Sequence, residues 1–343
     1  MMKLALAILA VLAASVQAAK YYDDSAKAAL TIGTEESKSL DFKFQADHSD
    51  IFVFGPACEK ADSCAKEAHA TFDPVKNNGT VGSQDLHFNG VVVDEYSGIT
   101  VQLDKAVSTH KILVATKPID PKKTVSFDSD AYFGLRIHRD DTAFSSLVDG
   151  QEEGKKFLLI IPKDPKNSKS EGQVVVGADD NKACAEFSLQ DTQVFSNQSS
   201  WAVQINITYS GKSGLVNVAP AFTEKLLIND RIKAEIFGSG ELSADEYKNA
   251  TDLVIKHGKV EIKIPKEQLF VEKDKKYVLN ADPTGTHDDF QLGLNNNVLK
   301  NYCIKLVKET EKYTIGLSDR KNSVGLVSAS LGLLMGMLAV VRL

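Results

Sequence analysis

Hydrophobic residues recur at every second position along most of the chain, in short runs separated by clusters of Asp, Asn, Gly and Ser. Leu40, Phe42 and Phe44 form one such run, and Ile51 with Val53 begins the next. A period of two is typical of strands with one buried face. Further strands are predicted at residues 91–93, 100–103, 111–115, 157–161, 173–176, 201–209 and 260–264. The chain is therefore predicted to be mainly β.

Helical patterning is confined to short segments, at residues 141–148 and 221–228. A polar stretch with two glycines, residues 149–154, is interpreted as a junction between two parts of the chain. Residues 163–172 are predicted to form a solvated hairpin loop. With both apolar ends set aside, about three hundred residues remain, which is enough for two lobes in one chain.

The amino terminus has the pattern of a secretory signal peptide at residues 1–18. Lys3 precedes an apolar run over residues 4–12, which fades through small residues to Ala18. The alternative is a buried first helix. Four Asn-x-Ser/Thr sequons are candidate glycosylation sites, at Asn78, Asn197, Asn206 and Asn249. Together these features predict passage through the secretory pathway to an extracellular or cell-surface location.

Four cysteines are expected to pair along that oxidising route. Cys58 and Cys64 close a short loop, which predicts one disulfide between them. Cys184 and Cys303 then pair by elimination. The sequence thus predicts two disulfide bonds.

The carboxyl end, residues 324–343, is an almost wholly apolar tail that stops at Arg342 and Leu343. Such a tail is typical of a membrane span or of a lipid-anchor signal. The alternative is a terminal strand followed by a packed tail. We expect attachment to a membrane through this segment.

Charge and motifs exclude several classes of function. The net charge of −6 and the pI of about 5.7 oppose a nucleic-acid surface, which needs a basic stripe. No metalloprotease, serine hydrolase, phosphate-loop or zinc-finger pattern occurs, so no cofactor or metal is expected. His287, Asp288 and Asp289 could ligate a hard metal, but a solvated turn is favoured. His48 and Ser49 would point to opposite faces of a strand, which disfavours a nucleophile with its base.

Segments of the first half follow an informative order. They are residues 30–34 (LTIGT), residues 44–53 (FQADHSDIFV), the loop of Cys58 and Cys64, residues 72–74 (FDP) and residues 130–135 (DAYFGL). In this order they resemble the pepsin-like aspartic proteases, whose corresponding segments read IGTP, FDTGSSNLWV, a small disulfide loop, FxP and DGILGL. The resemblance continues with residues 172–180 (GQVVVGADD), 201–205 (WAVQI), 313–315 (YTI) and 319–326 (DRKNSVGL).

The resemblance implies a bilobal, mainly β acid-protease fold with short helices. Its N-terminal lobe would span residues 20–152 and its C-terminal lobe residues 153–327. In the family each lobe supplies one catalytic aspartate, and the two carboxyls share a proton. Here the first position is Gln45 and the second is Ala221, neither of which can take a proton from water. The family's flap tyrosine is replaced by Phe88.

The expected function is therefore non-catalytic. The cleft between the lobes, near Asp47, Phe88 and Thr223, would bind a peptide, a protein or a small apolar ligand. One alternative is an active aspartic protease in which Asp47 and Asp230 supply the carboxyls. Another is a cell-surface structural or interaction glycoprotein in which the cleft has no role.

Overall fold

The computed structural model describes residues 19–21, 27–34, 37–46, 48–137, 141–163, 172–192, 200–284, 290–310 and 312–321. Several predictions lie outside these residues: the signal peptide at 1–18, the tail at 324–343, Asp47, Asn197 and residues 287–289. Within the described part of the chain, no helix is long and apolar enough to cross a membrane.

The protein is mainly β, as predicted, and the strands of the described residues form four sheets. The largest has eight strands, seven along its path and β6 (Leu86–Phe88) paired to β7 beside it. Its order is β2 (Lys27–Ile32), β3 (Lys38–Gln45), β9 (Ala131–Gly134), β4 (Ile51–Phe54), β8 (Ala106–Pro118), β7 (Val91–Leu103) and β5 (Thr80–Val81), and β2 also pairs with β7. The sheet therefore curves back on itself.

A seven-stranded sheet is formed by later residues. Its order is β18 (Val260–Ile264), β17 (Leu253–His257), β13 (Val203–Tyr209), β14 (Lys212–Pro220), β22 (Leu292–Leu294), β15 (Leu226–Ile228) and β21 (Ala281–Pro283). A three-stranded sheet lies beside it, in the order β16 (Glu241–Leu242), β20 (Lys276–Leu279) and β19 (Phe270–Lys273).

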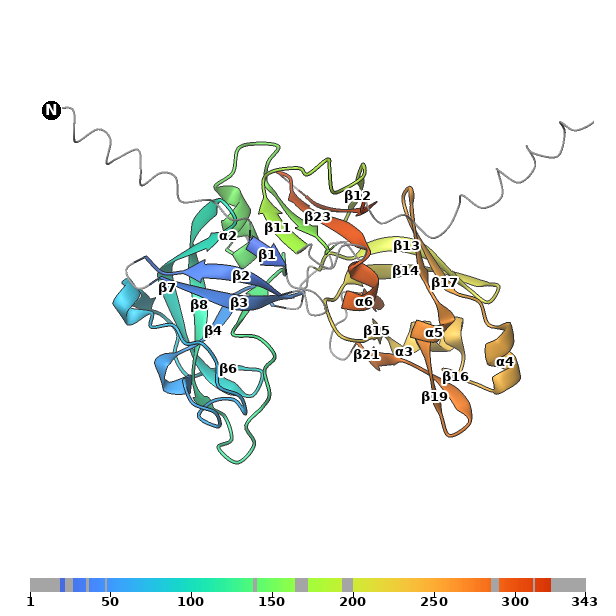
Figure 1. Cartoon of the computed structure of the whole chain (residues 1–343), viewed down its shortest axis with the longest axis horizontal. Coiled ribbons are helices and arrows are strands. Elements are labelled where there is room, and N and C mark those ends of the chain that lie inside the picture. The colour runs from blue at the N-terminus through green and yellow to red at the C-terminus, as the bar shows by residue number, and fades with distance from the viewer. Residues whose placement is uncertain are drawn as a thin grey trace, which may run out of the picture.

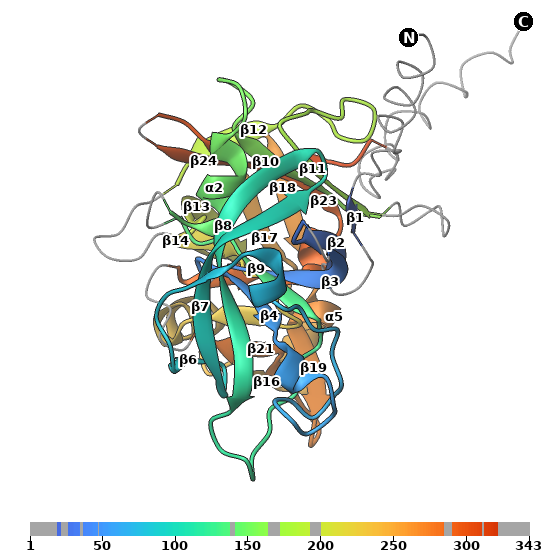
Figure 2. The same ribbon diagram turned by 90° about the vertical axis from the view of Figure 1, so that its left-hand side faces the viewer.

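A six-stranded sheet combines strands from distant parts of the chain. Its order is β1 (Ala19–Tyr21), β11 (Gly172–Val176), β10 (Phe157–Ile161), β23 (Tyr302–Lys308), β24 (Tyr313–Asp319) and β12 (Ser188–Asp191). In Figure 1 the eight-stranded sheet lies at the left and the seven-stranded sheet at the right, with strands of the six-stranded sheet between and above them. Figure 2 views the molecule from the side of the eight-stranded sheet.

The helical segments are short and lie at the ends of strands. They are η1 (Pro56–Cys58), η2 (Val75–Asn77), α2 (Ala143–Asp149), α3 (Asp230–Ile232), η3 (Lys233–Phe237), α4 (Ala244–Asn249), α5 (Lys266–Leu269) and α6 (Asn296–Leu299). The helix expected at 141–148 is confirmed as α2, whose first turn is capped by the Thr142 hydroxyl accepting from the Ser145 N–H.

The helix expected at 221–228 is wrong. Residues 221–225 form a loop, and Leu226–Ile228 is strand β15, which pairs with both β21 and β22. Leu226 and Ile228 are buried while Leu227 between them is half-buried, so the apolar pattern is the period of a strand. Pairing on both edges outweighs the weak helical preference of this short segment.

Trp201 joins α2, the six-stranded sheet and the start of β13. Its side chain is 1% exposed, and its Nε1–H donates to the Leu135 carbonyl oxygen at 2.7 Å. The rings of Phe144 and Tyr313 pack edge-on against the indole, with centroids 4.8 and 5.8 Å away. Because Trp carries an N–H and Tyr an O–H, these residues are favoured in a buried site only where a hydrogen-bond partner is in reach. This contact holds the sheets in one continuous apolar core.

Both predicted disulfides are confirmed. Cys58 and Cys64 are bonded with their Cα atoms 5.0 Å apart, and Cys184 and Cys303 with theirs 6.0 Å apart. The second bond ties the residues before β12 to β23 across the six-stranded sheet. Two disulfides with no free cysteine indicate folding in an oxidising compartment.

The length of chain that each disulfide closes predicts that the two bonds contribute unequally to the free energy of unfolding. Cys184–Cys303 closes a separation of 119 residues and Cys58–Cys64 one of 6. Because cross-linking restricts the unfolded chain more when the loop is longer, paired Cys→Ala changes should lower the free energy of unfolding by about 5 kcal/mol for the first bond and about 2 kcal/mol for the second. Urea unfolding of both double variants without reductant measures this, and equal losses would contradict the ordering.

Candidate functional site: two crossing loops

The first part of the site is a loop that crosses over the end of a strand. In the eight-stranded sheet, β9 lies between β3 and β4, parallel to β3 and antiparallel to β4. The chain passes from β3 to β4 through residues 46–50, here named the first crossing loop. Gln45 ends β3 and is paired in register with Gly134 of β9.

The same arrangement recurs in the seven-stranded sheet. There β22 lies between β14 and β15, parallel to β14 and antiparallel to β15. Residues 221–225, the second crossing loop, join β14 to β15. The two sheets thus repeat one local topology, in which a middle strand from later in the chain separates two strands joined by a short loop.

Close packing at each middle strand requires a glycine. A Cβ on Gly134 would lie 2.4 Å from the His48 carbonyl oxygen, and one on Gly293 would lie 2.8 Å from the Ala221 Cβ. Backbone hydrogen bonds link each middle strand to its crossing region. The N–H of Leu135 donates to the Gln45 carbonyl oxygen at 2.8 Å, and the N–H of Ala221 donates to the Leu294 carbonyl oxygen at 2.9 Å.

The ring of Phe222 in the second crossing loop contacts that of Phe44, which lies on β3 just before the first crossing loop. Their centroids are 5.7 Å apart at an interplanar angle of 48°. Phe222 has a φ of 55°, which costs a residue other than glycine about 1–3 kcal/mol. The burial of its ring and a hydrogen bond from Asn296 Nδ2 to its carbonyl oxygen at 3.2 Å stabilise this backbone. The contact joins residues that are far apart in the sequence.

Half-buried polar side chains surround this contact: Gln45, His48, Ser49, Asp50 and Thr223. Ser49 Oγ donates to Asp50 Oδ2 at 2.9 Å, and Thr223 Oγ1 donates to the Lys225 carbonyl oxygen at 2.7 Å. Gln45 Oε1 is buried and accepts no hydrogen bond from the described residues. Gln45, directly before the first crossing loop, therefore has a buried acceptor without a hydrogen-bond partner among the described residues.

The sequence-predicted residues lie at or beside the crossing loops. Gln45 ends β3 directly before the first, and Ala221 is at the start of the second, where its side chain is buried against Gly293. Thr223 lies within the second loop. Phe88 is buried beside the first loop, with its ring 4.5 Å from that of His48 and stacked 4.4 Å from that of Phe52. Asp47 is outside the described residues.

Asp230 does not lie on either crossing loop. It begins α3, beyond β15, and lines a separate polar pocket of about 250 Å³ together with Lys233, Glu241 and Asp282. Its place in the fold therefore does not support the alternative in which it supplies a catalytic carboxyl at the crossing loops.

The chemistry open to this site follows from its side chains. An amide at Gln45 and a methyl at Ala221 cannot share a proton, so these two positions provide neither a general base nor a general acid. Among the residues that the structure describes, no group of three or more His, Cys, Asp or Glu side chains converges as a metal site would require. The aromatic contact and the half-buried polar groups are suited to binding.

Comparison with models of known protein families finds none that matches this chain, and comparison with curated protein sequences finds no match either.

Some residues of the site carried no signal in the strand pattern. The middle strand β22 has three residues, and it was not predicted as a strand. Gly293 between two leucines is its one sequence feature, and it indicates a close backbone approach only once the crossing topology is known.

A methyl group at Gly134 should disrupt the first crossing loop. Because the added Cβ would also lie 2.7 Å from the backbone N and O of Asp50, Gly134→Ala should lower the free energy of unfolding by about 2 kcal/mol or more. Gly150→Ala is the matched control, since nothing lies within 4 Å of its Cβ and its φ is −72°. Its stability should stay within about 1 kcal/mol of the parent in urea unfolding. Equal effects would contradict the packing argument.

Proposed function

We propose that this protein is a secreted, non-catalytic relative of the pepsin-like aspartic proteases. Its N-terminal lobe would comprise residues 20–152 and its C-terminal lobe residues 153–327. The ligand, an extended peptide or a small apolar molecule, would bind across the two crossing loops. The observation that carries the proposal is the repeated crossing topology, with Gln45 and Ala221 in place of ionisable groups.

The repeated topology supports the proposed family in a way that the sequence segments do not. In a proton-sharing dyad each half of the site supplies one carboxyl, so two equivalent loops must meet. Here the second crossing loop, through Phe222, contacts Phe44 at the end of the strand that leads into the first crossing loop. The meeting point has kept its aromatic and polar surface while the side chains that such a dyad needs are missing at Gln45 and Ala221.

The side chains around the loops support a binding role. The buried Oε1 of Gln45 has no hydrogen-bond partner among the described residues, and a buried acceptor gains free energy when a donor reaches it. A peptide backbone provides such donors at regular intervals. The rings of Phe88 and His48 provide an apolar surface beside it.

The proposed location follows from three features. The signal-peptide pattern, the sequons and the two disulfides all agree with a secretory route. The apolar tail at 324–343 would add attachment to a membrane at the cell surface.

Incubation with a peptide library between pH 3 and pH 7 should give no cleavage above the blank, because no carboxyl stands at Gln45 or Ala221. Mass spectrometry of the peptides, with pepsin as the positive control, measures this. Hydrolysis that a statine-type inhibitor blocks would overturn the proposal and favour the alternative with Asp47.

Peptides retained on immobilised protein test the binding role separately. Gln45→Arg places a large cation at the junction of the crossing loops and should reduce retention at least tenfold. Gln204→Arg is the matched control, because Gln204 is exposed on β13, and it should leave retention unchanged. Equal retention by all three proteins would exclude binding at the crossing loops.

Glycosylation tests the proposed location. Asn78 and Asn206 are exposed, at the end of η2 and on β13, so an oligosaccharide meets no steric barrier there. Asn249 is also exposed, with its side-chain amide donating to the Asp245 carbonyl oxygen at 3.0 Å. Protein secreted from eukaryotic cells should lose mass on treatment with an N-glycosidase, and Thr80→Ala should remove the modification at Asn78 alone. No change in mass would contradict the secretory route.

A further inference from the structure

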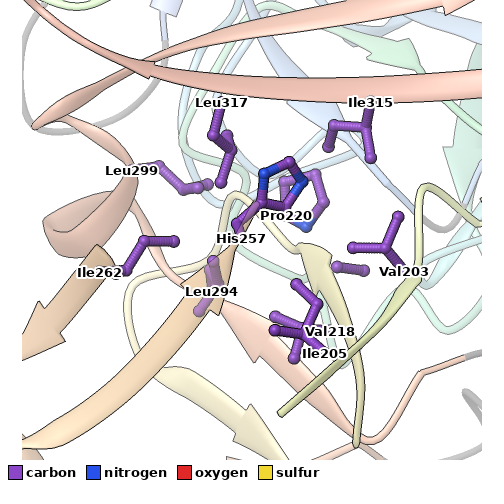
Figure 3. Close-up of a pocket in the computed structure, with 11 residues that line it drawn as sticks. Val203, Ile205, Val218, Pro220, His257, Ile262, Leu294, Leu299, Ile315 and Leu317 are labelled. Atoms are coloured by element: carbon purple, nitrogen blue, oxygen red, sulfur yellow. The ribbon is translucent and has the colours of Figure 1, made fainter. Parts of the chain in front are cut away.

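His257 faces a small apolar cavity inside the protein. The residue ends β17 and is 1% exposed. The cavity holds about 10 Å³, at the lower limit for one water molecule. Its other lining residues, most of them labelled in Figure 3, are Val203, Ile205, Val218, Ala219, Pro220, Ile262, Leu294, Leu299, Ile315 and Leu317. Apart from the imidazole, the walls of this cavity are apolar side chains.

The imidazole of His257 has no hydrogen bond to any other residue that the structure describes. A contact with its own backbone favours the charged ring, but it is outweighed by burial, and Figure 3 shows the ring amid apolar side chains. The other deeply buried histidine differs, because His110 Nε2 is 2.5 Å from Ser108 Oγ. Buried polar groups without partners are rare in folded proteins, and each one needs a physical reason.

No charged group faces the ring from the surrounding elements. The lining residues contributed by β13, β14, β18, β22, α6 and β24 are all apolar. Lys256 precedes His257 on β17 and is paired with Glu261 on β18. Both are exposed, on the face of the sheet opposite to His257. Protonation would therefore place a cation in an apolar site without a counter-ion, which is strongly unfavourable. Burial accordingly lowers the pKa of His257 to about 4.

Two residues that line the cavity adjoin the second crossing loop, so a displacement of the cavity walls would also displace that loop. Ile315 and Leu317 belong to β24 of the six-stranded sheet, whereas the ring comes from the seven-stranded sheet, so His257 packs between two sheets. Pro220 and Leu294 also line the cavity. Pro220 directly precedes Ala221, whose N–H donates to the Leu294 carbonyl oxygen.

We propose that His257 is an acid-sensitive switch: its protonation loosens the packing of β24 on the seven-stranded sheet and displaces the second crossing loop. The proposal goes beyond the proposed function and does not depend on any ligand. A secreted protein with this switch would keep its crossing loops together near neutral pH and separate them in an acidic compartment.

The direction of the pH dependence follows from the lowered pKa. The folded state favours the neutral ring, whereas in an opened state the ring returns toward its ordinary pKa of 6.5. Stability is therefore complete above about pH 6.5 and falls as the pH drops toward about 4. Full exposure of the ring on opening would raise the opening constant by about 300-fold over this interval. Below about pH 4 the ring is protonated in both states, so this contribution stops changing.

Hydrogen exchange of the full chain at pH 7, 5.5 and 4, corrected for intrinsic rates, tests the switch. Protection of β13, β14, β17 and residues 221–225 should fall progressively by up to about 300-fold relative to its value at pH 7. His257→Leu should remove most of this pH dependence. His87→Gln is the matched control, because His87 is exposed on β6, and it should behave as the parent. Unchanged pH dependence in His257→Leu would overturn the proposal.

A second measurement covers the case in which His257→Leu fails to fold. In the parent protein labelled at histidine ring carbons, the resonance of His257 should titrate near pH 4, as should that of the buried His110. Exchange at residues 221–225 should rise as the pH falls from about 6.5 toward about 4. A His257 titration near pH 6.5, or a loop whose exchange does not rise over that interval, would reject the switch whether or not the protein cleaves or binds peptides.

Discussion

The packing of the two middle strands beneath their crossing loops is the constraint on which the rest of the structure depends. Each middle strand comes from a later part of the chain than the two strands it separates, so neither sheet can be completed until distant residues meet. Gly134 and Gly293 are needed because the backbone or side chain of the loop lies within 3 Å of where a Cβ would be. The Trp201 indole, the Cys184–Cys303 bond and the six-stranded sheet then hold the assembled parts in place.

The Phe44–Phe222 contact explains how a site of this geometry remains stable without ion pairs at its centre. The two rings bury apolar area where the crossing loops meet, and their tilted arrangement contributes about 0.5–1.5 kcal/mol beyond that area. The same contact offsets the unfavourable φ of Phe222. Under the proposed function, the energy that fixes the junction comes from aromatic packing.

Apolar runs predicted the strands well where their pattern matches burial: β18 alternates and has one buried face, β10 is a continuous apolar run buried at every position, and the limits of both agree with those expected. The pairing of Cys184 with Cys303 also followed from the count of cysteines. By contrast, β15 was mistaken for a helix and β22 was missed, because three-residue strands carry too few positions to define a period. Ala221 and Gln45 could be singled out by resemblance, but the contact between their loops through Phe44 and Phe222 depends on topology that local pattern does not contain.

Ionisable groups at the crossing loops would carry an energetic cost that Gln45 and Ala221 do not. A pair of carboxyls in a partly buried site must share one proton, and the charge that remains is desolvated. Ala221 carries no such penalty, and Gln45 retains only one buried acceptor without a partner. The one strongly unfavourable ionisation that the described core retains near the second loop is that of His257, whose neutral form is favoured near neutral pH. Under the proposed switch, sensitivity to acid would lie in the apolar cavity behind the strands that support the second crossing loop.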